Sequence, residues 1–258
     1  MSKNFDIQND FPNTQRVAIL FSGGIESTLL AKLAFEFYGK DNVTLLWSDA
    51  IFCKNNTTVK NIIKQNVSSV AGHLKHPANY INIDYQEFLV DPISAQARSY
   101  IESAKKFNFS HLLMGITKMV WDVLDLQHIN PAEMKEMCFL DKEKYHHVIE
   151  QFHLKTDRYK SWVYEMNMHP DICNLLRKDN ERFRFPFKNL YKQDVIDLYF
   201  EYNFQDIIPF TRSCMKGLDA HCGDCFDCQN RFDAHYISGH PDKTEYISDE
   251  VVIRRLKL

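Results

Sequence analysis

Two stretches of the chain combine residue types and spacing that can carry chemistry. In the first, Ser22-Gly23-Gly24-Ile25-Glu26-Ser27-Thr28, two glycines stand among hydroxyl side chains and a carboxylate. Glycines permit a tight turn whose successive backbone N–H groups form a concavity for an anion. The second stretch gathers four of the seven cysteines: Cys214, Cys222, Cys225 and Cys228. The glycine loop, as we call residues 21–28, predicts a phosphate site, and the cysteine cluster predicts a metal site.

The sequence around the glycine loop predicts a strand before it and a helix after it. The apolar run at residues 17–20 is typical of a buried parallel strand, and apolar residues at helical spacing lead to Gly39, a common C-cap type. The helix dipole would add to the attraction for phosphate. The common mononucleotide and dinucleotide motifs do not fit these residues. A turn without a ligand remains the alternative. We expect phosphate contacts from Ser22, Gly23, Gly24, Glu26, Ser27 and Thr28.

Strand-like and helix-like segments alternate through the first half of the chain. Strands are expected at residues 17–21, 43–48, 80–83 and 111–115, and helices at 27–38, 59–71 and 92–107. The alternation predicts an α/β fold in which a parallel sheet carries helices on both faces. Ligands of such sheets bind at the carboxyl ends of the strands. We therefore expect Trp47, Asp49 and Gly115 to join the glycine loop around one ATP.

The later part of the chain departs from this alternation and then returns to it. Residues 118–180 have a helical pattern rich in Met, Trp, Tyr and His, and Lys192 begins a second helical pattern. We predict an ATP-binding core at residues 1–117 and 181–210, a helical insert at 118–180, and a zinc-binding C-terminal region at 211–258. From spacing alone, Lys192 is a polar residue in the first turn of a helix.

Composition narrows the class of protein. The 258 residues are 45% hydrophobic and 25% charged, which is ordinary for a globular chain with one large core. The net charge of −3 gives no electrostatic argument for a nucleic-acid partner. The sequence contains no apolar run long enough to span a membrane, and its polar start does not resemble a secretory signal. We expect a cytoplasmic protein.

The cysteine cluster has the spacing C-x7-C-x2-C-x2-C. Gaps of two residues let neighbouring thiolates reach one ion, and four thiolates complete a tetrahedral zinc site. A cytoplasmic chain would not hold these cysteines as disulfides. We predict a closed structural zinc site, with an iron–sulfur cluster as the alternative because it accepts the same four ligands.

Three motifs, in this order, resemble the 7-cyano-7-deazaguanine synthase family of pyrophosphate-loop ATP pyrophosphatases. The loop of that family reads Ser-Gly-Gly-x-Asp-Ser, and Glu26 stands here in place of the aspartate. Its Pro-Phe-x-x-Leu-x-Lys motif matches Pro186 to Lys192. Its cysteine motif matches Ser213-Cys214 followed by residues 221–231. The resemblance covers residues 16–50 and 183–235.

The resemblance implies an ATP-dependent C–N ligase with an adenine nucleotide alpha hydrolase-like, Rossmann-like fold. Members of the family act in queuosine biosynthesis. They activate 7-carboxy-7-deazaguanine with ATP and Mg²⁺, and use ammonia to convert the acyl-adenylate through an amide to a nitrile. They are typically homodimers with a structural zinc. The resemblance implies that Lys192 approaches the phosphates. Lys192 and Glu26 are the expected catalytic residues. We therefore expect Lys192 and Ser27 to face an open, solvent-filled phosphate space.

The middle of the chain departs from the family. Its Asp-Tyr-Gly-Gln, Pro-Gly-Arg-Asn and Ser-Gly-Tyr-Pro-Asp-Cys-Arg motifs are replaced at residues 48–51, 93–98 and 119–123. In the family these motifs shape the pocket for the acid. The sequence therefore does not identify the acid that this chain would activate. One alternative is a relative from a bacterial antiviral defence system that joins a deazaguanine acid to a protein amine, with residues 118–180 as the docking face. A tRNA thiolation enzyme and a nucleotide-binding module without turnover are further alternatives.

Overall fold

The computed structural model describes residues 5–48, 57–81, 92–115, 117, 183–214, 220–223 and 226–247. Asp49, Cys225 and the predicted helical insert lie outside these ranges. Within them, five strands form one sheet in the order β3-β2-β1-β4-β5. The strands are β1 (Val17–Leu20), β2 (Val43–Trp47), β3 (Ala78–Tyr80), β4 (His111–Met114) and β5 (Phe183–Arg184). All four pairings between these strands are parallel, which confirms the predicted parallel sheet.

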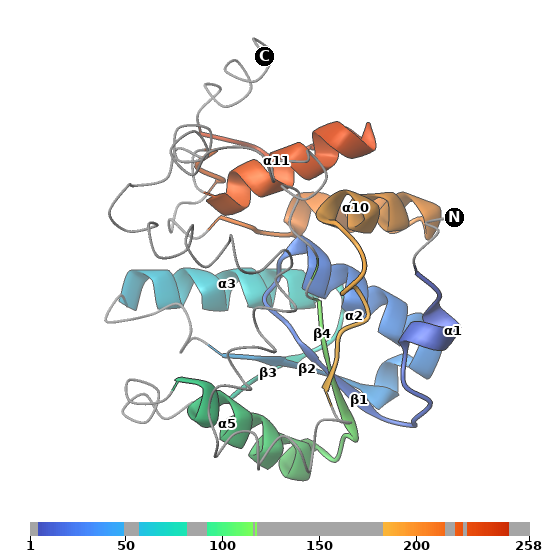
Figure 1. Cartoon of the computed structure of the whole chain (residues 1–258). Coiled ribbons are helices and arrows are strands. Elements are labelled where there is room, and N and C mark those ends of the chain that lie inside the picture. The colour runs from blue at the N-terminus through green and yellow to red at the C-terminus, as the bar shows by residue number, and fades with distance from the viewer. Residues whose placement is uncertain are drawn as a thin grey trace, which may run out of the picture.

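The direction in which strands are added to the sheet changes at β1. From β1 the chain moves outward through β2 to β3, and it then returns to the other side of β1 to add β4 and β5 (Figure 1). Leu20 at the end of β1 pairs with Met114 at the end of β4. In open sheets of this kind, ligands bind at the carboxyl ends of strands where the order reverses. The glycine loop follows β1 directly, and Gly115 follows β4, so both lie at this position.

Helices cover both faces of the sheet, as the alternation predicts. On one face lie α2 (Ile25–Tyr38), α3 (Thr57–His73) and α10 (Lys192–Glu201), and on the other lies α5 (Pro92–Phe107) (Figure 1). Neighbouring residues of β1 point to opposite faces. Ile19 belongs to the core that includes α2, whereas Ala18 packs with Tyr100 of α5. Burial on both faces explains why the strands read as continuous apolar runs.

Short elements complete the described fold. The helix α1 (Ile7–Asp10) is capped by Asp6, whose side chain accepts a hydrogen bond from the Gln8 N–H. The 3-10 helices are η1 (Lys40–Asn42) and η5 (Gln205–Phe210). The helix α2 starts two residues before the predicted position and ends at Gly39, whose positive φ of 79° suits a C-cap glycine. The strand β3 also starts two residues early, at Ala78.

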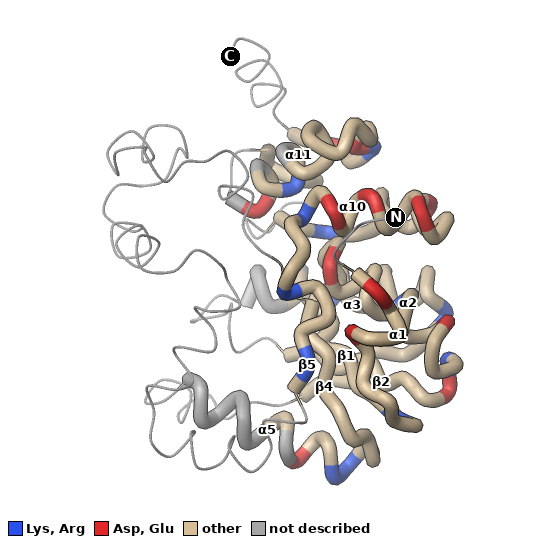
Figure 2. The backbone as a smooth tube through the Cα atoms, turned by 45° about the vertical axis from the view of Figure 1, so that its right-hand side comes forward, with Lys and Arg blue, Asp and Glu red and all other residues tan. Residues whose placement is uncertain are grey.

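The C-terminal part packs on the core through α11 (Phe226–Ser238), which lies against α10 (Figure 1). Figure 2 shows acidic and basic residues interspersed along the described backbone, with several acidic residues on α10. Among the helices of the described ranges, none combines the length and apolarity that crossing a membrane would need.

Candidate nucleotide site and metal cluster

The glycine loop folds into a tight turn whose hydroxyl groups face one another. Gly23 has a φ of +74°, a conformation that favours glycine, and Gly24 is the N-cap of α2. The hydroxyl oxygens of Ser22 and Ser27 lie 3.1 Å apart. The Ser22 hydroxyl also accepts from the Gly24 N–H at 3.3 Å, and the Ser27 hydroxyl accepts from the Ser22 N–H at 3.2 Å. The turn therefore brings two predicted phosphate ligands together.

The first turn of α2 supplies the backbone groups for an anion. The first N–H groups of any α-helix have no intrahelical acceptor, and the Gly24 N-cap offers no side chain to them. These groups and the positive end of the helix dipole face the end of β1, which is the geometry that binds phosphate in α/β proteins. Thr28, predicted as a further contact, is fully buried. Its hydroxyl is therefore inaccessible to solvent.

Glu26 and Lys192, the two predicted catalytic residues, form an ion pair. The Lys192 Nζ atom lies 3.0 Å from the Glu26 Oε1 atom, and their side chains are 5% and 14% exposed. Lys192 is the first residue of α10, whose start is fixed by a 2.7 Å hydrogen bond from the Tyr191 N–H to Asp194. Charge-assisted hydrogen bonds of this kind are stronger than neutral ones. The fold thus brings together one cation and one anion that lie far apart in the sequence.

The expected open space around Lys192 and Ser27 is not found. Both residues are buried, with 4% and 5% of their surface exposed. The reason is that each polar group has a partner within the protein. Lys192 is paired with Glu26, and the Ser27 hydroxyl lies against Ser22 and donates to the Gly24 carbonyl at 3.3 Å. A phosphate would have to replace or share these partners.

Tyr199 is a site residue that the sequence motifs did not reveal. Its fully buried hydroxyl donates a 2.8 Å hydrogen bond to the Ile25 carbonyl, next to Glu26. Burial raises the pKa of Tyr199 well above its ordinary value, so the phenol remains a donor. Tyr199 stands seven residues after Lys192, which places both on one face of α10. That spacing was the signal available in the sequence.

Gly115, a predicted residue of the nucleotide site, lies against the first turn of α2. A Cβ atom built on Gly115 would come within 3.0 Å of the Glu26 carbonyl carbon and 3.1 Å of its Cβ atom. Contacts this close are tighter than nine in ten contacts of real Cβ atoms, so a side chain here would require the first turn of α2 to shift by a few tenths of an ångström. The end of β4 therefore sets the position of the residue that pairs with Lys192.

Gly115→Ala is expected to lower the free energy of unfolding by about 1–3 kcal/mol, because overpacking must displace the start of α2. Nucleotide affinity should fall as well, since Glu26 moves with that turn. Gly72→Ala is the matched control, because a Cβ atom there meets nothing within 4 Å and Gly72 is helical. It should raise stability by about 0.5–1 kcal/mol. Urea unfolding and nucleotide titration measure both effects, and equal stability of the two variants would contradict the close approach.

Trp47 ends β2 at the same edge of the sheet. It is 7% exposed, and its ring centroid lies 4.7 Å from that of Tyr80 at a tilt of 59°. Tyr80 ends β3 and is 40% exposed. Aromatic rings of this kind offer an apolar face together with a polar tip. Tyr80 was not among the predicted site residues, because no motif marks it.

Three residues of the predicted metal site come together. Cys214, Cys222 and Cys228 are buried, and their sulfur atoms all lie within 4.8 Å of one another. The Sγ atoms of Cys222 and Cys228 are 3.9 Å apart. Two thiolates bound to one tetrahedral zinc at 2.3 Å would lie about 3.8 Å apart. The described thiols therefore fit a thiophilic metal, and Cys225, the fourth predicted ligand, lies outside the described residues.

We expect purified protein to contain one zinc ion per chain and to be colourless. Closed thiolate sites contribute directly to the free energy of folding, so Cys228→Ser should lose the metal and become poorly soluble or sensitive to protease. Cys173→Ser is the control, because this cysteine lies outside the cluster in the sequence. Elemental analysis is the measurement, and brown protein that contains iron and sulfide would instead establish an iron–sulfur cluster.

Comparisons with known proteins match part of the chain. No protein-family model matches it. A segment of 63 residues is 40% identical to the 7-cyano-7-deazaguanine synthase of Rhizobium meliloti (strain 1021). Over that segment the chain is similar to a 7-cyano-7-deazaguanine synthase. The segment is 24% of this chain and 25% of that protein, so the chain matches about a quarter of its curated relative.

Among solved structures, the chain is similar to the U34-tRNA thiolase NcsA from Methanococcus maripaludis with its [4Fe-4S] cluster. The superposition covers 93% of this chain and 79% of that one, at 12% sequence identity and a TM-score of 0.39. This likeness is too distant to support an inference about the function of this chain.

Proposed function

We propose that the protein is an ATP-dependent adenylating ligase. The observation that carries the proposal is the meeting of Lys192 and Glu26 at 3.0 Å beside the glycine loop, where the strand order of a parallel sheet reverses. An ammonium group next to a helix N-terminus can neutralise a phosphate chain. Backbone N–H groups and a lysine in a site of low exposure stabilise developing negative charge without reorganisation.

The proposed reaction has two group transfers. A carboxylate oxygen of the substrate attacks the α-phosphorus of ATP, the bond from that phosphorus to the bridging oxygen breaks, and pyrophosphate leaves. An amine then attacks the acyl carbon, loses a proton, and AMP leaves with its electron pair. The glycine loop would hold the pyrophosphate, and Lys192 would neutralise its charge. Bound Mg²⁺ would supply further charge neutralisation, with Glu26 and Asp49 as the residues to hold it.

We propose a 7-deazaguanine carboxylate as the acid and ammonia as the amine. The 40% identity to a 7-cyano-7-deazaguanine synthase over 63 residues supports this choice, as do the cysteine motif and the buried thiols. Ammonia would give an amide, and a second activation of that amide with loss of AMP would give the nitrile. The protein's role throughout is to position the reactants and to stabilise charge.

A second candidate keeps the adenylation and changes the acceptor to an amine of another protein. It is favoured by the replacement of the family motifs at residues 48–51, 93–98 and 119–123, which shape the acid pocket in the synthase family. A protein amine needs a site open to a lysine or a chain terminus, whereas ammonia needs a closed one, because water would hydrolyse the acyl-adenylate.

The experiment is to incubate the protein with ATP, Mg²⁺ and 7-carboxy-7-deazaguanine, with either ammonia or a protein encoded by a neighbouring gene. Mass spectrometry follows both acceptors, and the nucleotide products are separated by chromatography. A nitrile supports the synthase, and a mass increase on the protein supports the conjugating enzyme. AMP formation without either product would reject the proposed acid. ADP and phosphate as products would reject the pyrophosphate-loop assignment itself.

A further inference from the structure

A short segment joins the glycine loop to the cysteine cluster. In this connecting segment, residues 211–214, the Arg212 N–H donates a 2.9 Å hydrogen bond to the Gly23 carbonyl. A Cβ atom on Gly24 would lie 3.5 Å from the Arg212 carbonyl oxygen. Both glycines of the loop thus lie against the backbone of one residue. The carbonyl of Gly23 fixes the plane of the next peptide, and therefore the direction of the Gly24 N–H group.

The same segment enters the cysteine cluster two residues later. The Ser213 N–H donates to the His221 Nε2 atom at 2.9 Å, and the Cys222 N–H points to the Cys214 sulfur at 3.5 Å. Two residues of chain span at most about 7 Å. A displacement of Cys214 must therefore also displace Arg212.

The start of the connecting segment is held by α11. Thr211 is 1% exposed, and Arg231 donates to its carbonyl at 3.2 Å and to its hydroxyl at 2.8 Å. Arg231 follows Cys228 by three residues, which is less than one turn of α11. The metal ligands thus lie close to both ends of a segment whose second residue, Arg212, bonds to the glycine loop.

We propose that metal binding at the cysteine cluster and nucleotide binding at the glycine loop are positively coupled through the connecting segment. Metal at Cys214, Cys222 and Cys228 fixes the segment, and Arg212 then holds Gly23 and Gly24 in the conformation that binds phosphate. The reverse follows from thermodynamic linkage, since each ligand must raise the affinity of the other by the same factor. The inference rests on the proposed function only in taking a nucleotide as the ligand of the loop.

The test uses the full chain and α,β-methylene-ATP, which the proposed reaction cannot cleave. Zinc affinity is measured by competition with a chelator of known affinity, with and without saturating nucleotide. We expect it to rise by at least about fivefold, the lower end of typical coupling. Unchanged zinc affinity at saturation would overturn this inference and leave the proposed function standing. No nucleotide binding to the zinc-loaded protein would overturn both.

A pair of variants distinguishes this route from general stabilisation of the fold. Arg212→Ala keeps the N–H group that bonds to Gly23 and should keep the coupling. Arg212→Pro removes that donor, and Thr211, at φ −74° and ψ 143°, already has a conformation that a following proline accepts. Its coupling factor should fall to about one while zinc still binds. Equal coupling in the two variants would overturn the proposal that the connecting segment carries the coupling. If the proline variant does not fold, the change in zinc affinity of the wild-type protein decides whether the two sites are coupled.

Discussion

Lys192→Ala is expected to lower kcat/KM for AMP formation by about 100- to 1000-fold, the usual effect of losing one charge-stabilising group. Lys192 contributes the ammonium that pairs with Glu26 at 3.0 Å. In the transition state, charge develops on the pyrophosphate, so the ammonium is worth more there than in the ground state. The loss should therefore appear in kcat as well as in KM. Steady-state kinetics of pyrophosphate release measures it.

Lys188→Ala is the matched control for this prediction. Lys188 lies in the same segment but is exposed, so its loss should leave kcat/KM within about twofold, as for ordinary surface changes. Wild-type activity in the Lys192 variant would remove that residue from the proposed mechanism. Glu26→Asp adds a second readout, because it shortens the carboxylate that now holds Lys192. Equal or higher activity would identify Glu26 as an ordinary substitute for the aspartate of the family loop.

Arg231→Met is expected to lower the free energy of unfolding by about 3–5 kcal/mol, as is typical when one partner of a buried ion pair is removed. The Arg231 side chain is fully buried and its Nε atom lies 2.9 Å from the Asp242 Oδ2 atom, with Asp242 5% exposed. Without Arg231, Asp242 would remain as a buried charge. The guanidinium also donates to the Ile208 carbonyl at 3.1 Å, so η5 would lose a contact to α11.

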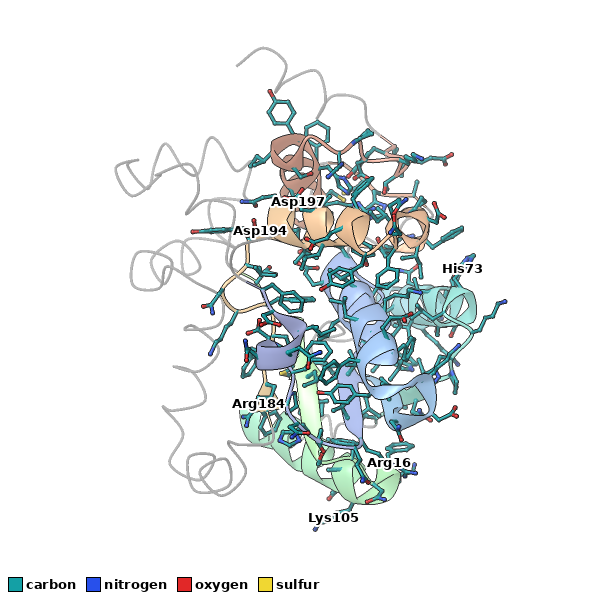
Figure 3. The ribbon with its side chains drawn as sticks, turned by 90° about the vertical axis from the view of Figure 1, so that its right-hand side faces the viewer. Arg16, His73, Lys105, Arg184, Asp194 and Asp197 are labelled. Carbon is teal, nitrogen blue, oxygen red and sulfur yellow. The ribbon has the colours of Figure 1, made fainter. Side chains whose placement is uncertain are left out.

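Arg16→Met is the control for this change. Arg16 is exposed and lies at the opposite end of the molecule from α11 (Figure 3), and its replacement should change stability by no more than about 0.5 kcal/mol. Urea unfolding of the zinc-loaded protein measures both variants. A loss below 1 kcal/mol in Arg231→Met would mean that Asp242 finds water or another partner when the arginine is absent.

The same ion pair gives a pH dependence with a defined sign. Burial alone would raise the pKa of Asp242, but the Arg231 guanidinium and its hydrogen bonds hold it well below its ordinary value. A carboxyl group with a lowered folded-state pKa stabilises the protein above its unfolded pKa, about 3.9, and loses this effect as the pH falls further. The stability difference between wild type and Asp242→Asn should therefore be constant near neutrality and shrink below about pH 4. A difference that grows in acid would contradict the ion pair.

Local patterns in the sequence were sufficient for the strands β1 to β4 and for the position of the glycine loop after β1, whereas β5 was not predicted. The apolar run of β1, the two glycines and the helical spacing after them each depend on near neighbours. Residues such as Tyr199 and Arg212 could not be found in this way, because their roles are contacts to Ile25 and Gly23 across the fold. The expected exposure of Lys192 was wrong for a related reason. The motif predicted a contact to phosphate, whereas the ion pair of Lys192 with Glu26 is a contact between residues far apart in the sequence.

The late position of β5 in the sequence has a consequence for synthesis of the chain on the ribosome. β5 pairs with β4 through Leu112 and Phe183, with residues 115–182 between them, and Lys192 follows β5. Domains form as the N-terminal part emerges, whereas closing so long a connection is slow. A nascent chain ending before β5 would carry the complete glycine loop and Gly115 but not Lys192. An incomplete translation product would therefore lack the Lys192–Glu26 ion pair, and the proposed adenylation would reach its full rate only when the last third of the chain has folded.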